Sequence, residues 1–293
     1  MVLITEEKLR AWIKPASDSE ENRCDATIEN IKNCIKNYSF AQLGQPLINL
    51  RGSYNNNTNV KNDSDVDMYA LFDGYCYNVA QNFQLIHSYS ATGPSYTDFN
   101  RAVYLCLTQK YGAENITVGN KSLKVKNNSY KVKADIVPVV TAYYKGINKV
   151  KGVAFFSAKN EFILNFPQQD YENGCQKNVN TSNRYKYCVR IFKRFRNELE
   201  DEGVLTSKIP SYVIESLLYN VPDRFFSATS YIENVYTIVN YLLDRIDFSN
   251  FVEVNQIKNM FSPHLFPEQK TTRMEIKRYL QLIKLSMFEE LAA

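Results

Sequence analysis

The sequence is poor in the residues that build thiolate metal sites and disordered tails. Its 293 residues include two histidines, His87 and His264, and six cysteines without any C-x-x-C pair. This spacing excludes a zinc site of the usual Cys/His kind. Gly and Pro number only 10 and 9 against 44% hydrophobic residues, which excludes a disordered chain. Because no apolar run reaches the length of a bilayer span, we expect a soluble, cytoplasmic protein with reduced thiols and no membrane partner.

Charge of one sign is also scarce. The formal net charge is +4, well short of the basic balance of proteins that coat nucleic acid. Small anionic substrates fit this balance better than a stably bound nucleic acid. With 21 Tyr and 17 Phe the chain can build an aromatic core, so we expect a folded globular protein.

The hydrophobic pattern changes character along the chain. Helical spacing over 18–40 and 94–111 brackets a strand-like stretch at 65–72. We expect an α+β fold with two lobes: a mixed-sheet lobe with a long N-terminal helix at 1–170, and a helical lobe at 171–293. Further strands are expected at 121–126 and 129–140, joined at Asn127-Asn128, and at 152–158 and 161–166; further helices are expected at 177–201, 210–220, 227–247 and 272–291, the last with a Thr272–Glu275 capping box.

Two carboxylates stand two positions apart on the first of these strands. Asp65 and Asp67 should project from the same face. Two like charges about 5 Å apart repel by on the order of 3 kcal/mol at an effective dielectric near 20, so the pair needs a cation or a raised pKa. Mg²⁺ prefers such hard oxygen ligands. By itself, an Asp-x-Asp pair is also common in solvated turns.

A third carboxylate, Asp135, lies on a later strand, where Lys133 should share its face. An antiparallel neighbour would bring Asp135 beside Asp65 and Asp67. Three carboxylates can hold two Mg²⁺ ions about 4 Å apart, with Mn²⁺ able to substitute, for in-line phosphoryl transfer. Asp65, Asp67 and Asp135 are therefore the predicted catalytic and metal-binding residues.

A Gly-Ser pair precedes the first two carboxylates. Gly52 and Ser53 follow a short apolar strand and precede a polar, Asn-rich loop at 55–62. Glycine lets backbone N–H groups approach a phosphate, and the serine hydroxyl adds a donor. Either motif alone carries little information, but strand, Gly-Ser, polar loop, Asp-x-Asp and a distant strand Asp together have few purely structural explanations. Gly52 and Ser53 are therefore predicted to bind a triphosphate.

These residues resemble the signature of polymerase-β-like nucleotidyltransferases. The longer strings RGSYNNNTNVKNDSDVDMYALF, KADIVPVV, NFPQQDYENGCQKNVNT, YKYCVRIFKRFRNELEDEG and IPSYVIESLLYNVP resemble the bacterial cyclic-oligonucleotide synthases, relatives of cyclic GMP-AMP synthase. The resemblance covers nearly the whole chain. It implies a two-lobed synthase that makes a linear intermediate from nucleoside triphosphates and then closes it into a ring.

The resemblance also implies substrate-binding residues in the helical lobe. Lys193 corresponds to a triphosphate-binding lysine, Ser211 to a phosphate-contacting serine and Tyr212 to a base-stacking tyrosine. Lys193 shares one helical face with Lys186, Arg190 and Asn197, a stripe that could face phosphates or could simply be a solvated face. Ser211 after Pro210 suits a helix N-terminus, where N–H groups attract anions. Tyr212 could equally be a core aromatic.

The implied biology is a second messenger for bacterial anti-phage (CBASS) defence, acting through a downstream effector and compatible with a regulatory protein partner. Substrates would be ATP, GTP or pyrimidine triphosphates. The zinc-binding insertion of DNA-sensing relatives is missing, so activation by DNA is not expected. The same metal centre also serves template-independent enzymes that modify RNA or protein, and a catalytically silent nucleotide-binding module could keep the fold; both alternatives stay open here.

Overall fold

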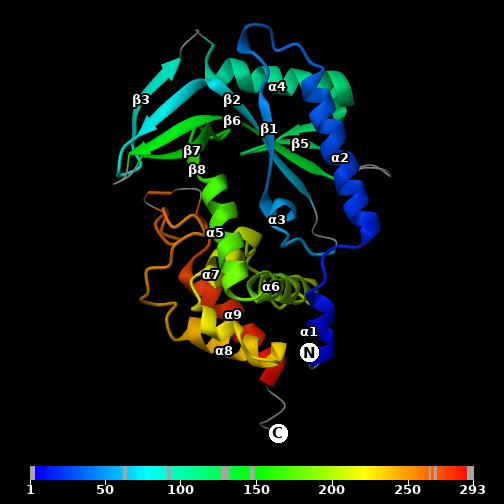
Figure 1. Ribbon diagram of the computed structural model, residues 1–293, viewed down its shortest axis with the longest axis vertical. Helices are drawn as coiled ribbons and strands as arrows, with labels where there is room; N and C mark the ends of the chain where they lie inside the picture. The colour runs from blue at the N-terminus through cyan, green and yellow to red at the C-terminus, as the bar shows by residue number, and fades with distance from the viewer. Residues whose placement is uncertain are drawn as a thin grey trace. The chain divides into compact units, whose positions relative to one another are not determined.

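The computed structural model describes residues 4–61, 65–90, 94–126, 132–145, 149–263, 265–266 and 269–288. The chain forms two compact units (Figure 1). The sheet unit consists of Ser17–Asn55 and Asp63–Gln168, and the helical unit of Met1–Ala16, Asn56–Asn62 and Gln169–Ala293. Three separate segments thus build the helical unit. The division into lobes at 1–170 and 171–293 stays a prediction, and the hairpin at Asn127-Asn128 lies outside the described residues.

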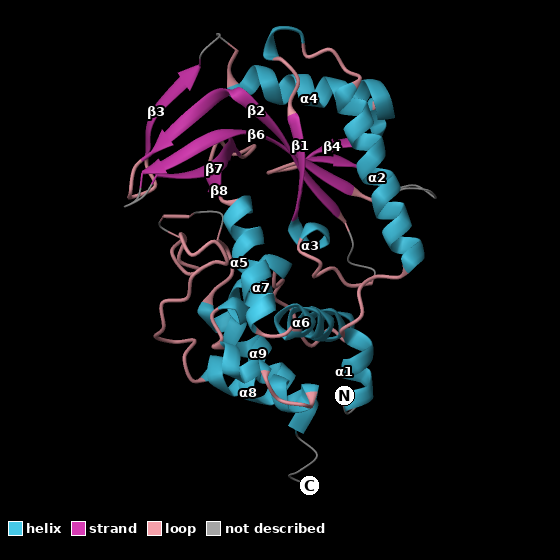
Figure 2. Cartoon of the chain, viewed as in Figure 1, coloured by secondary structure: helices cyan, strands magenta, loops and turns pink. Residues whose placement is uncertain are grey.

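A mixed sheet with two long helices makes up the sheet unit (Figure 2), in agreement with the predicted α+β class. The described strands run in the order β1-β2-β6-β5-β4; β3 also pairs with β2, β7 with β6, and β8 with β7. Only the described pairing of β2 with β6 is parallel. The elements are α2 (Asp18–Lys36), β1 (Leu47–Arg51), α3 (Gly52–Asn55), β2 (Val66–Val79), β3 (Leu85–Ser90), α4 (Tyr96–Tyr111), β4 (Ile116–Val118), β5 (Leu123–Val125), β6 (Ala134–Lys145), β7 (Lys149–Phe156) and β8 (Phe162–Asn165), with short 3-10 turns at Ala41–Leu43 and Ala113–Asn115.

Alternation along β2 decides which face of the sheet is available for chemistry. Val66, Met68 and Ala70 are fully buried, and Phe72 continues this face. Phe72 stacks on Phe99 of α4 with ring centroids 5.2 Å apart, so this face packs against α4. Since successive side chains of a strand point to opposite faces, Asp67 lies on the face turned away from α4.

The pairing of β6 with β5 and β7 explains how a central strand can contain a proline. Pro138 has no N–H to donate and is normally excluded from central strands. On one edge, β6 pairs with β5 up to Ile136 and with β7 from Val140 onward. Pro138 falls in the gap between these two pairings. The strand that carries Asp135 can therefore stay central in the sheet.

Helices pack around an aromatic and aliphatic core in the helical unit. Trp12 packs edge-on against Phe195 with ring centroids 4.9 Å apart, which ties α1 to a helix far along the chain. The single helix predicted over 177–201 is wrong, because Ser182 and Asn183 have positive φ angles of 50° and 70° and separate two helices. The predicted capping box is confirmed by reciprocal Thr272–Glu275 hydrogen bonds. The helices are α1 (Glu6–Trp12), α5 (Pro167–Asn180), α6 (Arg184–Asp201), α7 (Ser211–Tyr219), α8 (Tyr231–Leu243) and α9 (Arg273–Phe288), with a 3-10 turn at Asp223–Phe226.

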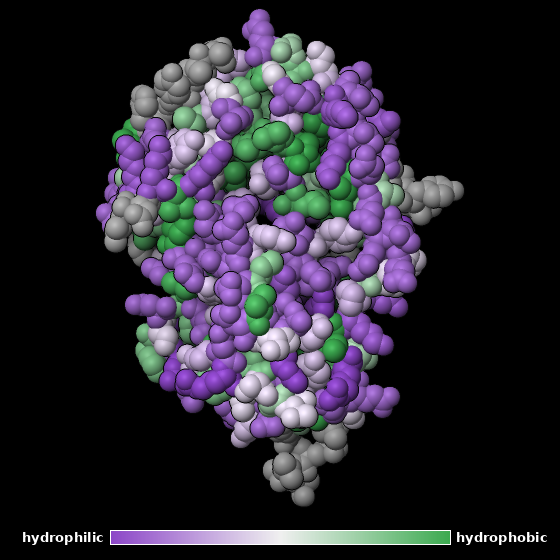
Figure 3. Space-filling view, viewed as in Figure 1, coloured by the Kyte–Doolittle hydropathy of each residue, from purple (hydrophilic) through white to green (hydrophobic). Residues whose placement is uncertain are grey.

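Hydrophilic side chains predominate on the face shown in Figure 3, with apolar residues in smaller groups. Among the described helices, none combines the length and the apolar composition that crossing a bilayer requires. The six cysteines all lie in the described part of the chain and form no disulfide.

Candidate functional site

Two of the three predicted carboxylates lie side by side in the sheet unit. Asp67 of β2 is in register with Asp135 of β6, and the two strands are parallel. The prediction that the strand of Asp135 runs antiparallel to the strand of Asp67 is therefore wrong. The long connection between β2 and β6 contains α4, so it can return the chain in the same direction, as a tight hairpin cannot.

Basic residues flank this carboxylate pair on both sides. β1 places Arg51 opposite Asp67, and β5 places Lys124 opposite Asp135. Residues in register project from one face of a sheet, so the four side chains form a charged row: cation, carboxylate, carboxylate, cation. Arg51 Nη2 lies 3.9 Å from Asp67 Oδ1, and Lys124 Nζ lies 3.6 Å from Asp135 Oδ2. The flanking cations offset the repulsion between the two adjacent carboxylates.

Asp65 lies just before β2 and has a cation of its own. Lys133 Nζ donates a hydrogen bond of 2.5 Å to Asp65 Oδ2. This hydrogen bond, together with the charges of Asp65, Asp135 and Asp67, raises the pKa of Lys133 above its ordinary value. Each predicted metal ligand is thus paired with one basic side chain of the sheet unit.

The surroundings of Asp67 favour its neutral form. Burial raises the pKa of Asp67, and the charges of Asp135 and Asp65 raise it further, while Arg51 acts in the opposite direction. A carboxylate that is buried beside two others is costly to ionise without a strong cation nearby. This is the electrostatic setting in which a divalent cation stabilises the ionised form.

Gly52 brings the backbone against the Asp67 carboxylate. β1 ends at Arg51 and α3 begins at Gly52, whose φ of +71° is in the left-handed region. A Cβ added at Gly52 would lie 2.3 Å from Asp67 Oδ2. The predicted close approach is therefore made to a carboxylate of the charged row, and contact with a phosphate stays a prediction. Ser53, the next residue of α3, is partly exposed.

The carboxylates of the charged row have part of what a divalent cation needs. Within the described residues, no group of three or more His, Cys, Asp or Glu side chains is arranged to hold a metal ion. However, Asp67 and Asp135 are adjacent, and Asp135 Oδ1 is buried without a hydrogen-bond partner in the described part of the chain. Carboxylate oxygens are the ligands that Mg²⁺ prefers. The donor chemistry fits such a cation at Asp67 and Asp135, and Asp65 could join once Lys133 releases it.

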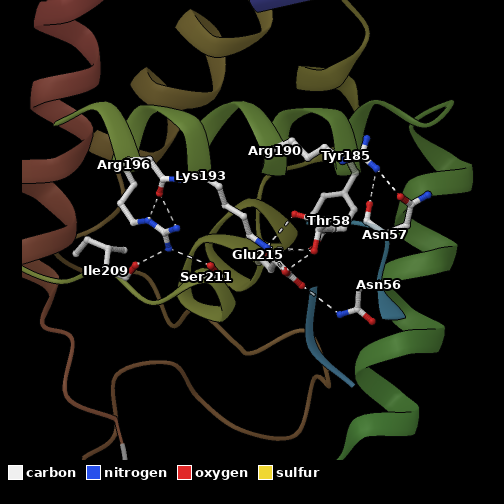
Figure 4. Close-up of polar contacts among 11 residues, drawn as sticks. Asn56, Asn57, Thr58, Tyr185, Arg190, Lys193, Arg196, Ile209, Ser211 and Glu215 are labelled. Atoms are coloured by element: carbon white, nitrogen blue, oxygen red, sulfur yellow. Dashed lines mark hydrogen bonds and ion pairs between the residues drawn. The ribbon is translucent and has the colours of Figure 1, made fainter. Parts of the chain in front are cut away.

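Lys193 belongs to the helical unit, where it forms a buried ion pair (Figure 4). Its Nζ lies 2.7 Å from Glu215 Oε1 and donates to Thr58 O at 3.1 Å. The Lys193 side chain is 1% exposed and that of Glu215 is 6% exposed. Burial would raise the pKa of Glu215, but Lys193 and hydrogen bonds from Thr58 and Asn56 hold it below its ordinary value. Contact between Lys193 and a phosphate would require this pair to open, and that contact stays a prediction.

The basic stripe of α6 is largely buried, so its interpretation as a solvated face is wrong. Arg190 and Lys193 are 3% and 1% exposed, and Lys186 and Asn197 are half-buried. Arg190 donates to the backbone oxygens of Ile13 and Asn57 at 2.7 and 2.8 Å. The predicted polar loop thus docks on α6, because the loop backbone supplies acceptors that a buried guanidinium requires.

Ser211 and Tyr212 lie at the first turn of α7, as predicted for Ser211. Ser211 Oγ accepts a hydrogen bond of 2.9 Å from Arg196. Tyr212 Oη donates to Asp170 at 2.7 Å and accepts from Asn255 at 3.0 Å, so its ring is held at the hydroxyl end. These are contacts within the chain, and binding of a phosphate by Ser211 and of a base by Tyr212 stays a prediction.

A small pocket lies in the helical unit, next to these residues. Asp170 and Glu215 contribute carboxylates to its wall and Lys186 an ammonium. Tyr185 also lines it and donates to the backbone oxygen of Glu215 at 3.0 Å. The remaining lining residues are Asn56, Thr58, Tyr171, Gly174 and Val254.

Among the residues that touch the predicted ones, sequence reasoning missed Arg51, Ser122, Lys124 and Glu215. Arg51 and Lys124 become visible only when strand register is known, because nothing in a single strand says which residue lies opposite. Glu215 follows Ser211 by four positions on α7, and this helical spacing was the available signal.

Known proteins resemble this chain over nearly its full length. Residues 172–286 match the family model of the cGAS/DncV-like nucleotidyltransferase C-terminal helical domain. The cyclic dipyrimidine nucleotide synthase CdnE of Legionella pneumophila is 35% identical over 285 residues, which cover 94% of this chain and 95% of that protein. The cyclic UMP-AMP synthase of Rhodothermus marinus is 30% identical over 274 residues, covering 91% of this chain and 92% of that one.

Solved structures agree with these sequence matches. The Rhodothermus marinus CdnE c-UMP-AMP synthase with Apcpp and Upnpp superimposes with a TM-score of 0.83 at 29% identity, covering 96% of each chain. The Elizabethkingia meningoseptica CdnE cyclic dinucleotide synthase with GTP and Apcpp gives 0.81 at 26% identity, covering 99% of this chain and 100% of that one.

Proposed function

Because the chain belongs to the cGAS/DncV-like family of bacterial cyclic nucleotide synthases, which are nucleotidyltransferases, we propose that it joins nucleoside triphosphates into a cyclic di- or trinucleotide. Similarity over 94% of this chain to a cyclic dipyrimidine nucleotide synthase supports the class of product. The observation in the structure that carries the proposal is the register of Asp67 with Asp135 beside Gly52.

The proposed reaction is an in-line displacement at an α-phosphorus. A ribose hydroxyl of one nucleotide forms the new P–O bond while the bond to pyrophosphate breaks, and a second such step closes the ring. Asp65, Asp67 and Asp135 would hold two Mg²⁺ ions, which when bound activate the hydroxyl and neutralise the leaving group. Gly52 and Ser53 are proposed to bind the triphosphate.

Residues of the helical unit are proposed to bind other parts of the nucleotides. Lys193 and Ser211 would contact phosphate, and Tyr212 would stack on a base. Supporting this assignment, Tyr212 carries an aromatic ring, and hydrogen bonds at its hydroxyl hold that ring in one orientation. Following the resemblance in the sequence, we extend the proposal to a second messenger for anti-phage signalling that a downstream effector reads.

The test is incubation of the purified protein with each labelled nucleoside triphosphate and mixtures of them, with Mg²⁺ and no nucleic acid. Relatives are named for dipyrimidine, UMP-AMP and dipurine products, so all four triphosphates are needed. Phosphatase-resistant cyclic products, identified by mass spectrometry, are expected. Product that appears only when RNA or protein is added would support the alternative acceptors, and nucleotide binding without pyrophosphate release would support the silent module.

The double variant Asp65→Asn/Asp67→Asn tests the metal ligands. It should keep the fold, because repulsion among carboxylates is relieved, and lose turnover. Asp73→Asn is the matched control, since Asp73 lies on the same strand with its side chain 64% exposed and pairs with Lys151. Product formation by the double variant at the rate of the control would refute the assignment.

A further inference from the structure

The two carboxylate oxygens of Asp135 have unequal surroundings. Oδ2 accepts a hydrogen bond of 3.0 Å from Ser122 Oγ and lies 3.6 Å from Lys124 Nζ. Oδ1 is buried and has no hydrogen-bond partner in the described part of the chain. A buried acceptor without a partner is rare in folded proteins, because its lost hydration is not replaced. This asymmetry therefore calls for an explanation.

Backbone contacts hold Ser122 in position. Ser122 lies in the turn between β4 and β5, directly before Leu123. Gly119 N donates to Ser122 O at 2.8 Å and closes the turn, while Ala158 N donates to Asn120 O at 2.8 Å and fixes the turn from the β7–β8 side. The Ser122 hydroxyl must be the donor to an ionised Asp135, since a carboxylate only accepts.

The charged row explains why only one oxygen of Asp135 is engaged. Lys124 approaches Asp135 from the β5 side, where it also meets Oδ2. On the other side lies Asp67, which offers no charge that could stabilise Asp135. Ser122 and Lys124 therefore act on the same oxygen, and their combined effect is to fix the rotation of the carboxylate.

We propose that Ser122 is a positioning residue: with Lys124, its hydroxyl holds Oδ2 of Asp135 so that Oδ1 is presented to the catalytic divalent cation. The inference rests on the proposed function, in which Asp135 is a metal ligand. Groups that orient a metal ligand without touching the metal commonly change affinity by about 10- to 100-fold when removed. Ser122 fulfils this description through its contact with the oxygen opposite Oδ1.

Measurement of Mn²⁺ binding to the full chain tests the inference without relying on turnover. Free Mn²⁺ is counted by electron paramagnetic resonance during titration of the wild type, Ser122→Ala, Ser122→Thr and Asp135→Asn. Ser122→Ala should bind about 10- to 100-fold more weakly than the wild type, while Ser122→Thr, which keeps the hydroxyl, should recover most of the affinity. Asp135→Asn should lose the site.

Ser157→Ala provides the matched control. Ser157 also lies in a turn of this sheet and donates to a carboxylate, Glu161 Oε2, at 3.2 Å, but Glu161 is not a predicted ligand. This variant should bind Mn²⁺ as the wild type does, even if its melting temperature falls. If it weakens binding as much as Ser122→Ala does, the loss reflects a damaged sheet and the inference is wrong.

Two further outcomes separate the inference from the proposed function. Equal Mn²⁺ affinity of Ser122→Ala and the wild type, with a loss in Asp135→Asn, overturns the role of Ser122 and leaves the metal site intact. Equal affinity of Asp135→Asn and the wild type overturns the metal site itself, and with it the inference.

Discussion

At the residue scale, the position of the Asp67 carboxylate depends on the absence of a side chain at Gly52. Its φ of +71° costs a residue with a Cβ roughly 1 kcal/mol, and the added Cβ would lie 2.3 Å from Asp67 Oδ2. Gly44 has nearly the same φ, +72°, but has no atom within 4 Å of an added Cβ. Comparing substitutions at Gly44 and Gly52 therefore separates the effect of backbone strain from the effect of displacing Asp67.

Gly52→Ala should lower product formation by on the order of 100-fold, because misplacing a reacting group by about 1 Å has effects of this size. Gly44→Ala should keep the rate and lose only stability, because its positive φ strains a residue with a Cβ while no other atom lies within 4 Å of that Cβ. Steady-state product formation and thermal unfolding of the two variants provide the comparison. Equal rates in both would show that the position of Asp67 does not depend on Gly52.

The buried pair of Lys193 and Glu215 makes a second prediction at this scale. Removing one partner leaves a buried charge uncompensated, which costs about 3–5 kcal/mol. Lys193→Met and Glu215→Gln should each lower stability strongly, and the double variant should lose clearly less than the sum of the two. Urea unfolding of the four proteins measures the coupling; strictly additive losses would contradict it.

At the element scale, the sequence predicted most helices and strands but not their partners. Alternation of apolar residues located β2, and the capping box located the start of α9. The parallel pairing of β2 and β6 was not predictable from either strand, because register and direction are properties of two strands together. Arg51 and Lys124 were missed for this reason, although both are visible in the sequence as strand residues.

The interpretation of the α6 stripe as a solvated face was wrong for a related reason. Helical spacing correctly placed Arg190 and Lys193 on one face, but spacing cannot tell solvent from a polar segment of the same chain. The docked segment is the Asn-rich loop that precedes Asp65, and its backbone oxygens accept from Arg190. The polar composition of this stretch predicted a loop. It could not predict that the loop is buried against α6, because that depends on whether its backbone acceptors lie opposite donors of the helix.

Asp170 of α5, Tyr212 of α7 and the 252–259 segment form a cluster that predicts a pH dependence. Burial and the charge of Glu253 raise the pKa of Asp170 to about 7 from 3.8, against the opposing effects of Tyr212, Asn255 and Lys258. Between these values the folded protein binds a proton that the unfolded chain has released. The contribution of Asp170 to stability is therefore present at low pH and is lost as the pH rises toward about 7.

Asp170→Asn should remove this dependence. From about pH 5 to about pH 8, the wild type should lose more stability than the variant, since only the wild type must ionise a buried carboxyl. Urea unfolding of both proteins at several pH values measures the difference. Parallel curves across this range would exclude Asp170 as the titrating group.

At the scale of the whole molecule, the helical unit is assembled from three separated segments of the chain. A fragment of residues 169–293 lacks α1 and the 56–61 segment. It would expose the partners of Trp12 and leave Arg190 and Lys193 without the acceptors of Asn57 and Thr58. Burying such groups unpaired costs about 1–3 kcal/mol each, a large share of a small unit's stability.

We therefore expect the 169–293 fragment to lack a cooperative unfolding transition, while the full chain shows one. Circular dichroism during heating distinguishes the two. A fragment that unfolds sharply near the melting temperature of the full chain would show that α1 and the loop are dispensable to the helical unit.

The contact between Trp12 and Phe195 also has a consequence for biosynthesis. The ribosome makes α1 before the sheet unit, whereas α6 follows the entire sheet unit. During translation the Trp12 side chain therefore stays exposed until α6 has emerged from the ribosome. Apolar surface that stays exposed during synthesis favours aggregation and chaperone binding, and the helical unit can be completed only after the sheet unit has been made.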